Sequence, residues 1–398
     1  MTTSEPIIRL AAKGDGVTPS GRHVAGTVLG DMVDEGGVIT PGEHHITPAC
    51  RHFETCGGCQ LQHADDTMLA EFVRDRVANA ARGQGLEPAE LLPVHLSPPH
   101  SRRRAGLHAL RTAKGAVLGY REGGSHRVVD LAECPVLHPA LTALIVPLRG
   151  FVAAHGPKGM VGIDLTLADQ GVEANLANFP LEGLGPTEAA LDFAREHALA
   201  RLTIDQGYGP ETLWEPEPVT VTLAGVPVSL PPGAFLQATQ DAESRMAADA
   251  AEWLGDARLV ADLFAGLGTF AFALRQGRKV LAVEAERAAH LACKAAGAQS
   301  GGTVLALHRD LFRSPLQPDE LNRFDAVLLD PPRAGARAQV AEIAASTLAR
   351  VVYVSCNPSS WARDAATLTE AGFRLTKLRP VGQFRWSTHV ELVSLFER

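Results

Sequence analysis

The sequence predicts an α/β protein whose C-terminal part is built on a parallel sheet. Two observations lead to this prediction. From about residue 235, apolar runs typical of buried strands alternate with Ala-rich runs typical of helices. The apolar runs, among them RLVADLFAG, KVLAVEAE, FDAVLLDPP and VVYVSC, are nearly continuous, which indicates strands covered by helices on both faces.

Changes in pattern divide the chain into three regions. Residues 1–48 alternate short apolar runs with Gly, Asp and Pro, which predicts a small β-domain. Residues 49–232 predict a central, mainly β domain, and residues 233–398 the α/β domain. One helix is expected over 65–84, where it could pack on the α/β domain, because apolar residues recur there at helical spacing: Met68, Leu69, Phe72, Val73 and Val77.

Composition sets limits on the class of protein. The chain has 398 residues, 45% of them hydrophobic, and no apolar run long enough to cross a membrane. The start MTTSEPIIRL has no basic and apolar segments of a secretory signal, so we expect a cytoplasmic protein. A net charge of −8 argues mildly against a nucleic-acid partner. Against that, the stretch SRRRAGLHALR is basic and contains no acidic residue, although such a stretch is often only a solvated face.

Carboxylates follow several strands of the predicted sheet. A glycine turn with Gly266 and Gly268 joins a strand to a helix, and Glu284 ends the next strand, where a carboxylate can accept both ribose hydroxyls of a nucleoside. Asp310 and Asp330 end two further strands. Several carboxylates at one site disfavour a polyphosphate and favour a cationic nucleoside ligand, which S-adenosylmethionine would satisfy. A helix-capping role for Glu284 is the alternative.

A lone thiol, Cys356, also lies at a strand end, in VVYVSCNPSSWARD. Buried free cysteines are usually inert. Here Pro358 stops the strand and restricts the residue before it, so the thiol is presented at the edge of the sheet. Beside a methyl donor, a thiolate can add to an electron-poor double bond and create a carbon nucleophile.

The segments LLDPPRAG, VVYVSCNPSSWARD and STHVELVSLFER together resemble the uracil-C5 RNA methyltransferase family. The resemblance extends from CRHFETCGGCQLQH to the C-terminus and implies a Rossmann-like class I methyltransferase fold. It implies that Cys356 adds to C6 of uracil and that Glu391 removes the proton from C5. The resemblance also implies that S-adenosylmethionine contacts a set of six residues: Gln237, Phe264, Thr269, Glu284, Asp310 and Asp330. The sequence departs from the family at Thr239 and Thr269, where the family often has Asn.

A second group of cysteines precedes the predicted helix. Cys50, Cys56 and Cys59 have the spacing C-x5-C-x2-C, and Cys134 lies next to a proline farther on. Free thiols and a zinc site are possible readings, but three clustered thiolates with one distant thiolate suit an iron–sulfur cluster better. The resemblance implies a [4Fe–4S] cluster bound by these four cysteines. Cys293 lies in an Ala-rich run and is expected in the core.

The resemblance implies an RNA partner, with 23S ribosomal RNA as the expected substrate. We also expect no membrane partner and a monomeric chain. It suggests an OB-like N-terminal domain and phosphate contacts from Arg102, Arg103 and Arg104. The target uridine must leave its stack to reach Cys356. Alternatives are a transfer-RNA uracil-C5 methyltransferase and a non-catalytic iron–sulfur RNA-binding protein. The HVE segment argues against a cytosine-C5 enzyme, and Arg333 after DPP argues against an adenine-N6 enzyme.

Overall fold

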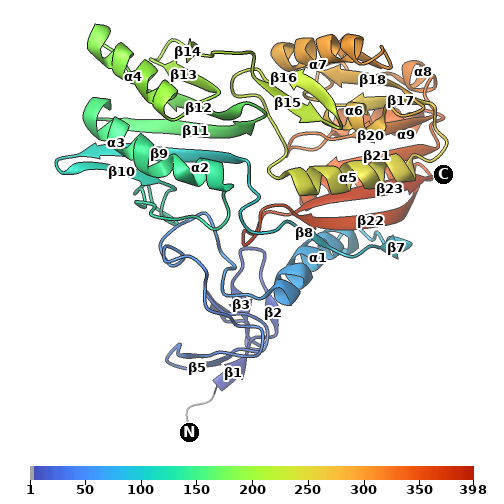
Figure 1. Cartoon of the computed structure of the whole chain (residues 1–398). Helices are drawn as coiled ribbons and strands as arrows, with labels where there is room; N and C mark the ends of the chain where they lie inside the picture. The colour runs from blue at the N-terminus through green and yellow to red at the C-terminus, as the bar shows by residue number, and fades with distance from the viewer. Residues whose placement is uncertain (1–3) are drawn as a thin grey trace.

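The C-terminal part of the protein is organised around one large sheet, seen in a computed structural model that describes residues 4–398 (Figure 1). The strand order is β19-β18-β17-β20-β21-β23-β22-β7, and β8 also pairs with β22. All pairs are parallel except those made by β23. The strands are β17 (Leu259–Leu263), β18 (Lys279–Glu284), β19 (Val304–His308), β20 (Ala326–Leu329), β21 (Arg350–Ser355), β22 (Arg374–Gly382), β23 (Glu391–Glu397), β7 (Glu90–Leu91) and β8 (His95–Leu96).

Helices cover both faces of this sheet, as the apolar strands require. Along β20, Ala326 and Leu328 face one core cluster, and Val327 and Leu329 face the other, because side chains alternate along a strand. One face packs against α5 (Gln240–Trp253), α6 (Thr269–Leu274) and α7 (Arg287–Gln299). The other face packs against α1 (Asp66–Arg82), α9 (Arg337–Ala345) and α10 (Pro358–Glu370), and the short α8 (Pro318–Leu321) adjoins it.

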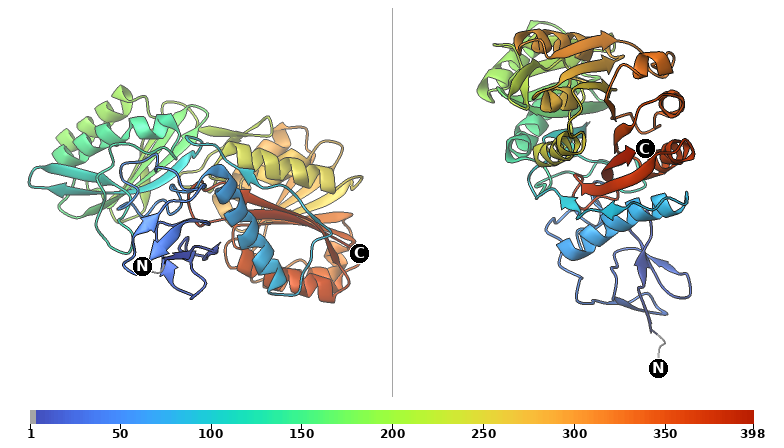
Figure 2. Two further views of the ribbon diagram at one scale, coloured as in Figure 1. Left: turned by 90° about the horizontal axis from the view of Figure 1, so that it is seen from below. Right: turned by 90° about the vertical axis from the view of Figure 1, so that its right-hand side faces the viewer.

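The expected helix at 65–84 is confirmed as α1, with Asp65 as its N-cap. Its apolar face packs against α10 and β22, and Figure 2 shows α1 lying between the N-terminal strands and the large sheet. The helix therefore belongs to the core of the large sheet, although about 180 residues of chain separate it from β17.

The direction of β23 has a direct effect on the site. Parallel strands end at one edge of the sheet, and β23 runs antiparallel to β21 with Leu392 opposite Ser355. Its first residue, Glu391, therefore lies at the edge where β21 ends. The sequence predicts only the parallel strands, and this reversed strand is an additional feature of the structure.

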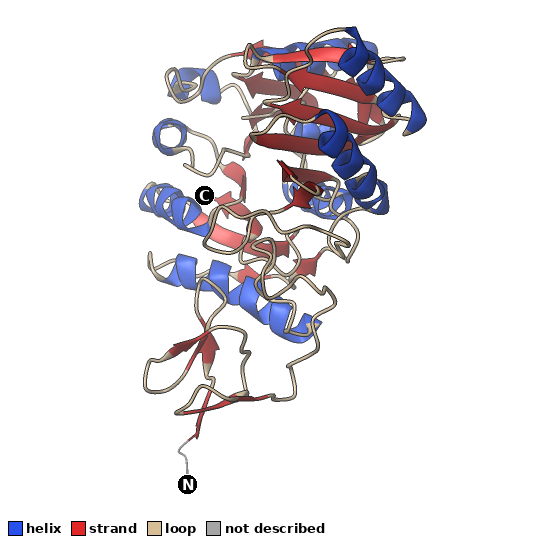
Figure 3. Cartoon of the chain, turned by 90° about the vertical axis from the view of Figure 1, so that its left-hand side faces the viewer, coloured by secondary structure: helices blue, strands red, loops and turns tan. Residues whose placement is uncertain are grey.

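A second sheet of six strands forms the central part, in the order β10-β9-β11-β12-β13-β14 (Figure 3). The structure adds two helices where the sequence indicates only strands and turns, and Pro147 is tolerated because it falls in a first helical turn. The elements are β9 (Arg104–Thr112), β10 (Gly115–Gly119), β11 (Met160–Ala168), β12 (Gly171–Ala177), β13 (Arg201–Asp205), β14 (Pro210–Trp214), α2 (Pro139–Ala143), α3 (Ile145–His155) and α4 (Leu184–Glu196). The hairpin of β15 (Thr220–Leu223) and β16 (Val226–Ser229) packs on the core of the large sheet.

The N-terminal strands form two separate three-stranded sheets, β1-β5-β6 and β2-β3-β4. An OB fold is a single five-stranded, partly open barrel, so the OB-like prediction is not confirmed. The strands are β1 (Ser4–Pro6), β2 (Arg9–Leu10), β3 (Gly16–Val17), β4 (His23–Val24), β5 (Met32–Asp34) and β6 (Ile39–Thr40).

No helix in the described part of the chain is long and apolar enough to span a bilayer.

Candidate active site

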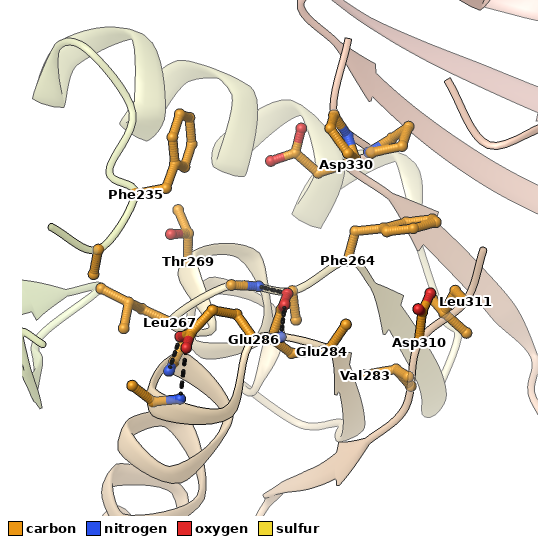
Figure 4. Close-up of a pocket in the computed structure, with 18 of the residues that line it drawn as sticks. Phe235, Phe264, Leu267, Thr269, Val283, Glu284, Glu286, Asp310, Leu311 and Asp330 are labelled. Atoms are coloured by element: carbon orange, nitrogen blue, oxygen red, sulfur yellow. Dashed lines mark hydrogen bonds between the residues drawn. The ribbon is translucent and has the colours of Figure 1, made fainter. Parts of the chain in front are cut away.

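A cavity of about 730 Å³ opens at the carboxyl edge of the large sheet. It lies where the strand order reverses between β17 and β20, which is the usual ligand site of open α/β sheets. Figure 4 shows Thr269, Glu284, Asp310 and Asp330 around it. The structure brings all eight predicted catalytic and methyl-donor residues together in its wall: Gln237, Phe264, Thr269, Glu284, Asp310, Asp330, Cys356 and Glu391.

The glycine turn forms the floor of the cavity. Gly268 has a φ of +90°, and a Cβ there would lie 2.7 Å from the ring of Phe272 and 2.8 Å from the sulfur of Cys293. Only glycine fits this position without displacing buried side chains. Phe264 also has a positive φ, of 65°, which is unusual for a non-glycine residue and is often found at functional sites.

Glu284 is held by backbone donors next to that turn. Its two oxygens accept hydrogen bonds from the backbone N–H groups of Gly266, at 2.8 Å, and Glu286, at 2.6 Å (Figure 4). Glu286, and not Glu284, caps α7 by accepting from Ala288 and Ala289. The alternative helix-capping role of Glu284 is therefore wrong, and its carboxylate is fixed at the cavity wall.

Asp330 lies deeper, at the end of β20. It accepts a hydrogen bond from Nε2 of Gln237 at 3.2 Å. Loss of hydration and the neighbouring carboxyls of Glu391 and Asp262 raise the pKa of Asp330 well above its usual value. A cationic ligand would relieve this repulsion, so the pocket favours a positively charged molecule.

Cys356 and Glu391 share one end of the cavity. Burial raises the pKa of Glu391 to about 7, against the opposing effects of a hydrogen bond with Gln383 and the charge of Arg333. Burial, followed by the charges of Glu391 and Asp330, raises the pKa of Cys356 to about 11, and Arg333 acts in the opposite direction. The thiol is therefore neutral in the protein alone, and Glu391 titrates near neutral pH.

Gln383 is a site residue that the sequence did not reveal. Its Oε1 accepts from the backbone N–H of Ala238 at 3.1 Å, and its Nε2 donates to Oε1 of Gln237 at 3.1 Å. The chain of hydrogen bonds continues to Asp330, so Gln383 orients Gln237 from the opposite side. Gln383 directly follows β22, a strand of mixed polar and apolar residues, so no local pattern pointed to its amide, which is buried and must find partners.

The three consecutive arginines have different environments. Arg103 is buried, forms an ion pair with Glu243 and donates to the carbonyl of Gln237, so its predicted contact with RNA phosphate is wrong. Arg104 donates to the carbonyl of Leu236 at 3.0 Å, and its guanidinium lies over the ring of Phe235. Both therefore hold the loop that contains Gln237. Arg102 has no ion pair in the described part of the chain and lies over the ring of Phe384.

The four cysteines of the central region line one small cavity of about 40 Å³, together with Arg102 and Tyr120. Burial raises the pKa of each thiol, that of Cys59 to about 12. Within residues 4–398, however, no group of three or more His, Cys, Asp or Glu side chains is arranged to hold a metal ion. The structure thus brings Cys50, Cys56, Cys59 and Cys134 together without supporting the iron–sulfur prediction. Cys293 is buried in the core of the large sheet, as expected.

The strand order and the carboxylate-lined cavity define an S-adenosylmethionine-dependent methyltransferase. The crystal structure of Pyrococcus abyssi tRNA (uracil-54, C5)-methyltransferase, with S-adenosyl-L-homocysteine, has the same fold: the TM-score is 0.78, 99% of each chain is covered, and 21% of residues are identical. A tRNA (uracil-5-)-methyltransferase family model matches residues 303–398.

Two sequence relatives extend this result to the whole chain. An RNA methyltransferase of Zymomonas mobilis is 51% identical over 98% of this chain and 99% of its own length. The 23S rRNA (uracil(1939)-C(5))-methyltransferase RlmD of Pectobacterium atrosepticum is 33% identical, over 90% of this chain and 82% of its own. The chain belongs to the uracil-C5 RNA methyltransferase family, and it is an RNA methyltransferase.

The glycine turn gives a test of the methyl-donor site. Gly268→Ala should lower affinity for S-adenosylhomocysteine by about tenfold or more, because the added methyl group displaces Phe272 or Cys293. Gly266→Ala is the matched control: its φ is also positive, but a Cβ there meets no atom within 4 Å, so its loss should be smaller. Isothermal titration calorimetry measures both. Equal affinities for the two variants would contradict the proposed floor of the cavity.

Proposed function

We propose that this protein methylates C5 of a uridine in 23S ribosomal RNA. The observation that carries the proposal is the placement of Cys356 and Glu391 in the wall of one cavity with the methyl-donor residues. Support for ribosomal RNA comes from the RlmD relative, whose similarity covers most of both chains. Transfer RNA is the second candidate, because the Pyrococcus enzyme with the same fold acts on it.

In the proposed reaction the thiol of Cys356 first loses its proton to solvent, the resulting thiolate adds to C6 of uracil, and the electrons of the C5–C6 double bond form an enolate. S-adenosylmethionine, when bound, supplies the methyl group that C5 accepts. Glu391 then takes the remaining proton from C5, the C5–C6 double bond forms again, and the C6–sulfur bond breaks to return the thiolate. A base with a pKa near 7 is well matched to this proton transfer.

The other residues of the cavity hold the reactants. Glu284 accepts the ribose hydroxyls of the donor, and Asp330 with Gln237 faces its positive end. Thr269, Phe264 and Asp310 complete the donor site. Arg333 is the positive charge that acts on both Cys356 and Glu391, and it opposes the rise of their pKa values. Since the thiol lies inside a cavity, the target base must leave the RNA stack to reach it.

The RNA substrate can be identified by mass spectrometry of nucleosides from a strain without this gene. We expect one 5-methyluridine to disappear from 23S ribosomal RNA and to return when the wild-type gene is restored. Restoration with Cys356→Ala should not bring it back. Loss from transfer RNA would replace the proposed substrate by the second candidate, and an unchanged 5-methyluridine content would refute the proposal.

The catalytic roles predict a trapped intermediate. Glu391→Gln should accumulate a covalent complex between protein and RNA that survives denaturing electrophoresis, because the C5 proton stays in place. The double variant Cys356→Ala/Glu391→Gln is the control and should give no complex, since no thiol can bond to C6. A complex of equal yield in the double variant would assign the nucleophile to another residue.

The decay of this complex in the wild-type protein should depend on pH. The folded-state pKa of Glu391 is raised to about 7, so the ionised base is lost as the pH falls through that value. Below it, rapid-quench measurements should show decay slowing about tenfold per pH unit. The thiol is already bonded at this stage, so its own titration does not enter. A decay rate that does not change with pH would argue against Glu391 as the base.

We also propose that the cysteine cavity holds a [4Fe–4S] cluster, because its four thiols converge on one space. A single ion with metal–sulfur bonds of about 2.3 Å needs sulfurs within about 4 Å of each other. A cluster has one iron at each thiolate, so its ligands stand farther apart. Four cysteines can therefore be spaced for a cluster even though, among the described residues, no group is arranged to hold a single metal ion.

The cluster proposal is tested on protein purified without oxygen. The wild type should contain iron and acid-labile sulfide and absorb visible light. Cys56→Ser/Cys59→Ser should lose all three signals and unfold at a lower temperature. Cys293→Ser, a buried thiol in another core, should keep the iron. Iron-free wild-type protein with the same unfolding temperature as the double variant would exclude the cluster.

A further inference from the structure

A second cavity, of about 400 Å³, lies apart from the methyl-donor site. Three segments enclose it: the N-terminal residues 8–12 with Leu29, one face of α1, and the start of α10. Figure 2 shows that the N-terminal strands adjoin α1 on the side away from the large sheet. The volume is within the range of about 300–1,000 Å³ that is usual for small-ligand sites.

Four charged side chains line this cavity, and a fifth, that of Arg74, lies beside the two carboxylates among them. Its two carboxylates, Glu71 and Asp75, are both within ion-pair distance of Arg74, at 3.8 Å and 3.2 Å. The remaining charges are the guanidinium groups of Arg9 and Arg76, and neither forms an ion pair within the described residues. Three guanidinium groups face two carboxylates, so these five side chains carry one positive charge in excess, in a protein whose net charge is −8.

Arg76 is the stronger of the two candidates for ligand binding. Its Nε is buried and has no hydrogen-bond partner among the described residues. A buried N–H of a charged group without a partner is costly, and an anion that accepts from it would remove that cost. A phosphate group has the geometry that a guanidinium fork binds best.

The other residues that line the cavity suit the flat ring of a nucleobase. Apolar side chains form part of the wall, and the polar groups of Asn79 and Ser359 lie beside them. Apolar surfaces accept the faces of a nucleobase, and amide and hydroxyl groups can bind its edges. The larger apolar members include Leu10, Leu29, Met68, Phe72 and Pro358.

A short stretch of chain connects the cavity to the reaction centre. Pro358 and Ser359 follow Cys356 within three residues at the start of α10. Burial lowers the pKa of His389, and the charges of Arg333, Arg102 and lastly Arg76 add to this, so Arg76 lies within electrostatic range of the loop before β23. A polynucleotide whose target base enters the reaction cavity would thus bring a neighbouring nucleotide to this second cavity.

We propose that the cavity between residues 8–12, α1 and the start of α10 binds a nucleotide that flanks the methylated uridine, with Arg76 contacting its phosphate. This inference rests on the proposed function, because it takes RNA as the substrate. It makes α1 and the N-terminal β-segment part of the RNA-binding surface. Arg76 is a positioning residue and takes no part in the covalent steps.

The test compares variants in their binding of an RNA fragment that contains the mapped uridine, by fluorescence anisotropy at several salt concentrations. Arg76→Gln should weaken RNA binding about tenfold and reduce the slope of log affinity against log salt by about 1. Asn79→Trp, which fills the cavity from an exposed position, should weaken binding without changing the charge. Both variants should bind S-adenosylhomocysteine as the wild type does.

Arg374→Gln is the matched control. Arg374 is exposed at the start of β22, so it lies at the end of the strands opposite to the one where Cys356 follows β21. It should keep the RNA affinity of the wild type. Wild-type RNA affinity and salt slope in both Arg76→Gln and Asn79→Trp would overturn the inference, and would leave the cavity to a ligand of another class. A failure of the proposed function would give a different result from a failure of this inference, because the wild-type protein itself would then not methylate the RNA.

Discussion

The antiparallel hydrogen bonding of β23 between β21 and β22 is the constraint on which the site depends. Parallel strands alone would bring Glu284, Asp330 and Cys356 to one edge of the sheet. Glu391 reaches that edge only because its strand runs the opposite way, with Leu392 opposite Ser355. A shift of one residue would turn Glu391 to the other face of the sheet and away from the thiol. The backbone pairing of β23 thus determines that Glu391 lies on the same side of the sheet as the thiol of Cys356.

Burial gives these groups their electrostatic character. The same loss of hydration raises the pKa values of Asp330, Cys356 and Glu391, and their negative charges would add to the effect. The charge of Arg333 opposes the rise for Cys356 and Glu391, and hydrogen bonds of Gln383 and Gln237 oppose it for Glu391 and Asp330. The cavity is thus short of positive charge until a cationic ligand enters, which couples occupation of the donor site to ionisation of the reacting groups.

The sequence predicts much of the site, for physical reasons that are visible in particular residues. Glu284, Asp310, Asp330 and Cys356 each follow an apolar strand, so the edge they share could be inferred from local pattern. Glu391 could be found only by family resemblance, because it begins a strand whose direction no local pattern reveals. The role of Arg103 was predicted wrongly, since its partner Glu243 is distant in sequence and burial is a tertiary property. Gln383 was missed for the same reason.

Helix α1 has a consequence for the order in which the protein folds. Its apolar face is completed by α10 and β22, which are synthesised almost three hundred residues later. Until then Met68, Phe72 and Val77 have no native partners in those elements, and they form an exposed apolar surface on the nascent chain. Long-range contacts of this kind slow folding and expose intermediates to aggregation. We therefore expect the growing chain to need a chaperone at this helix until its distant partners emerge from the ribosome.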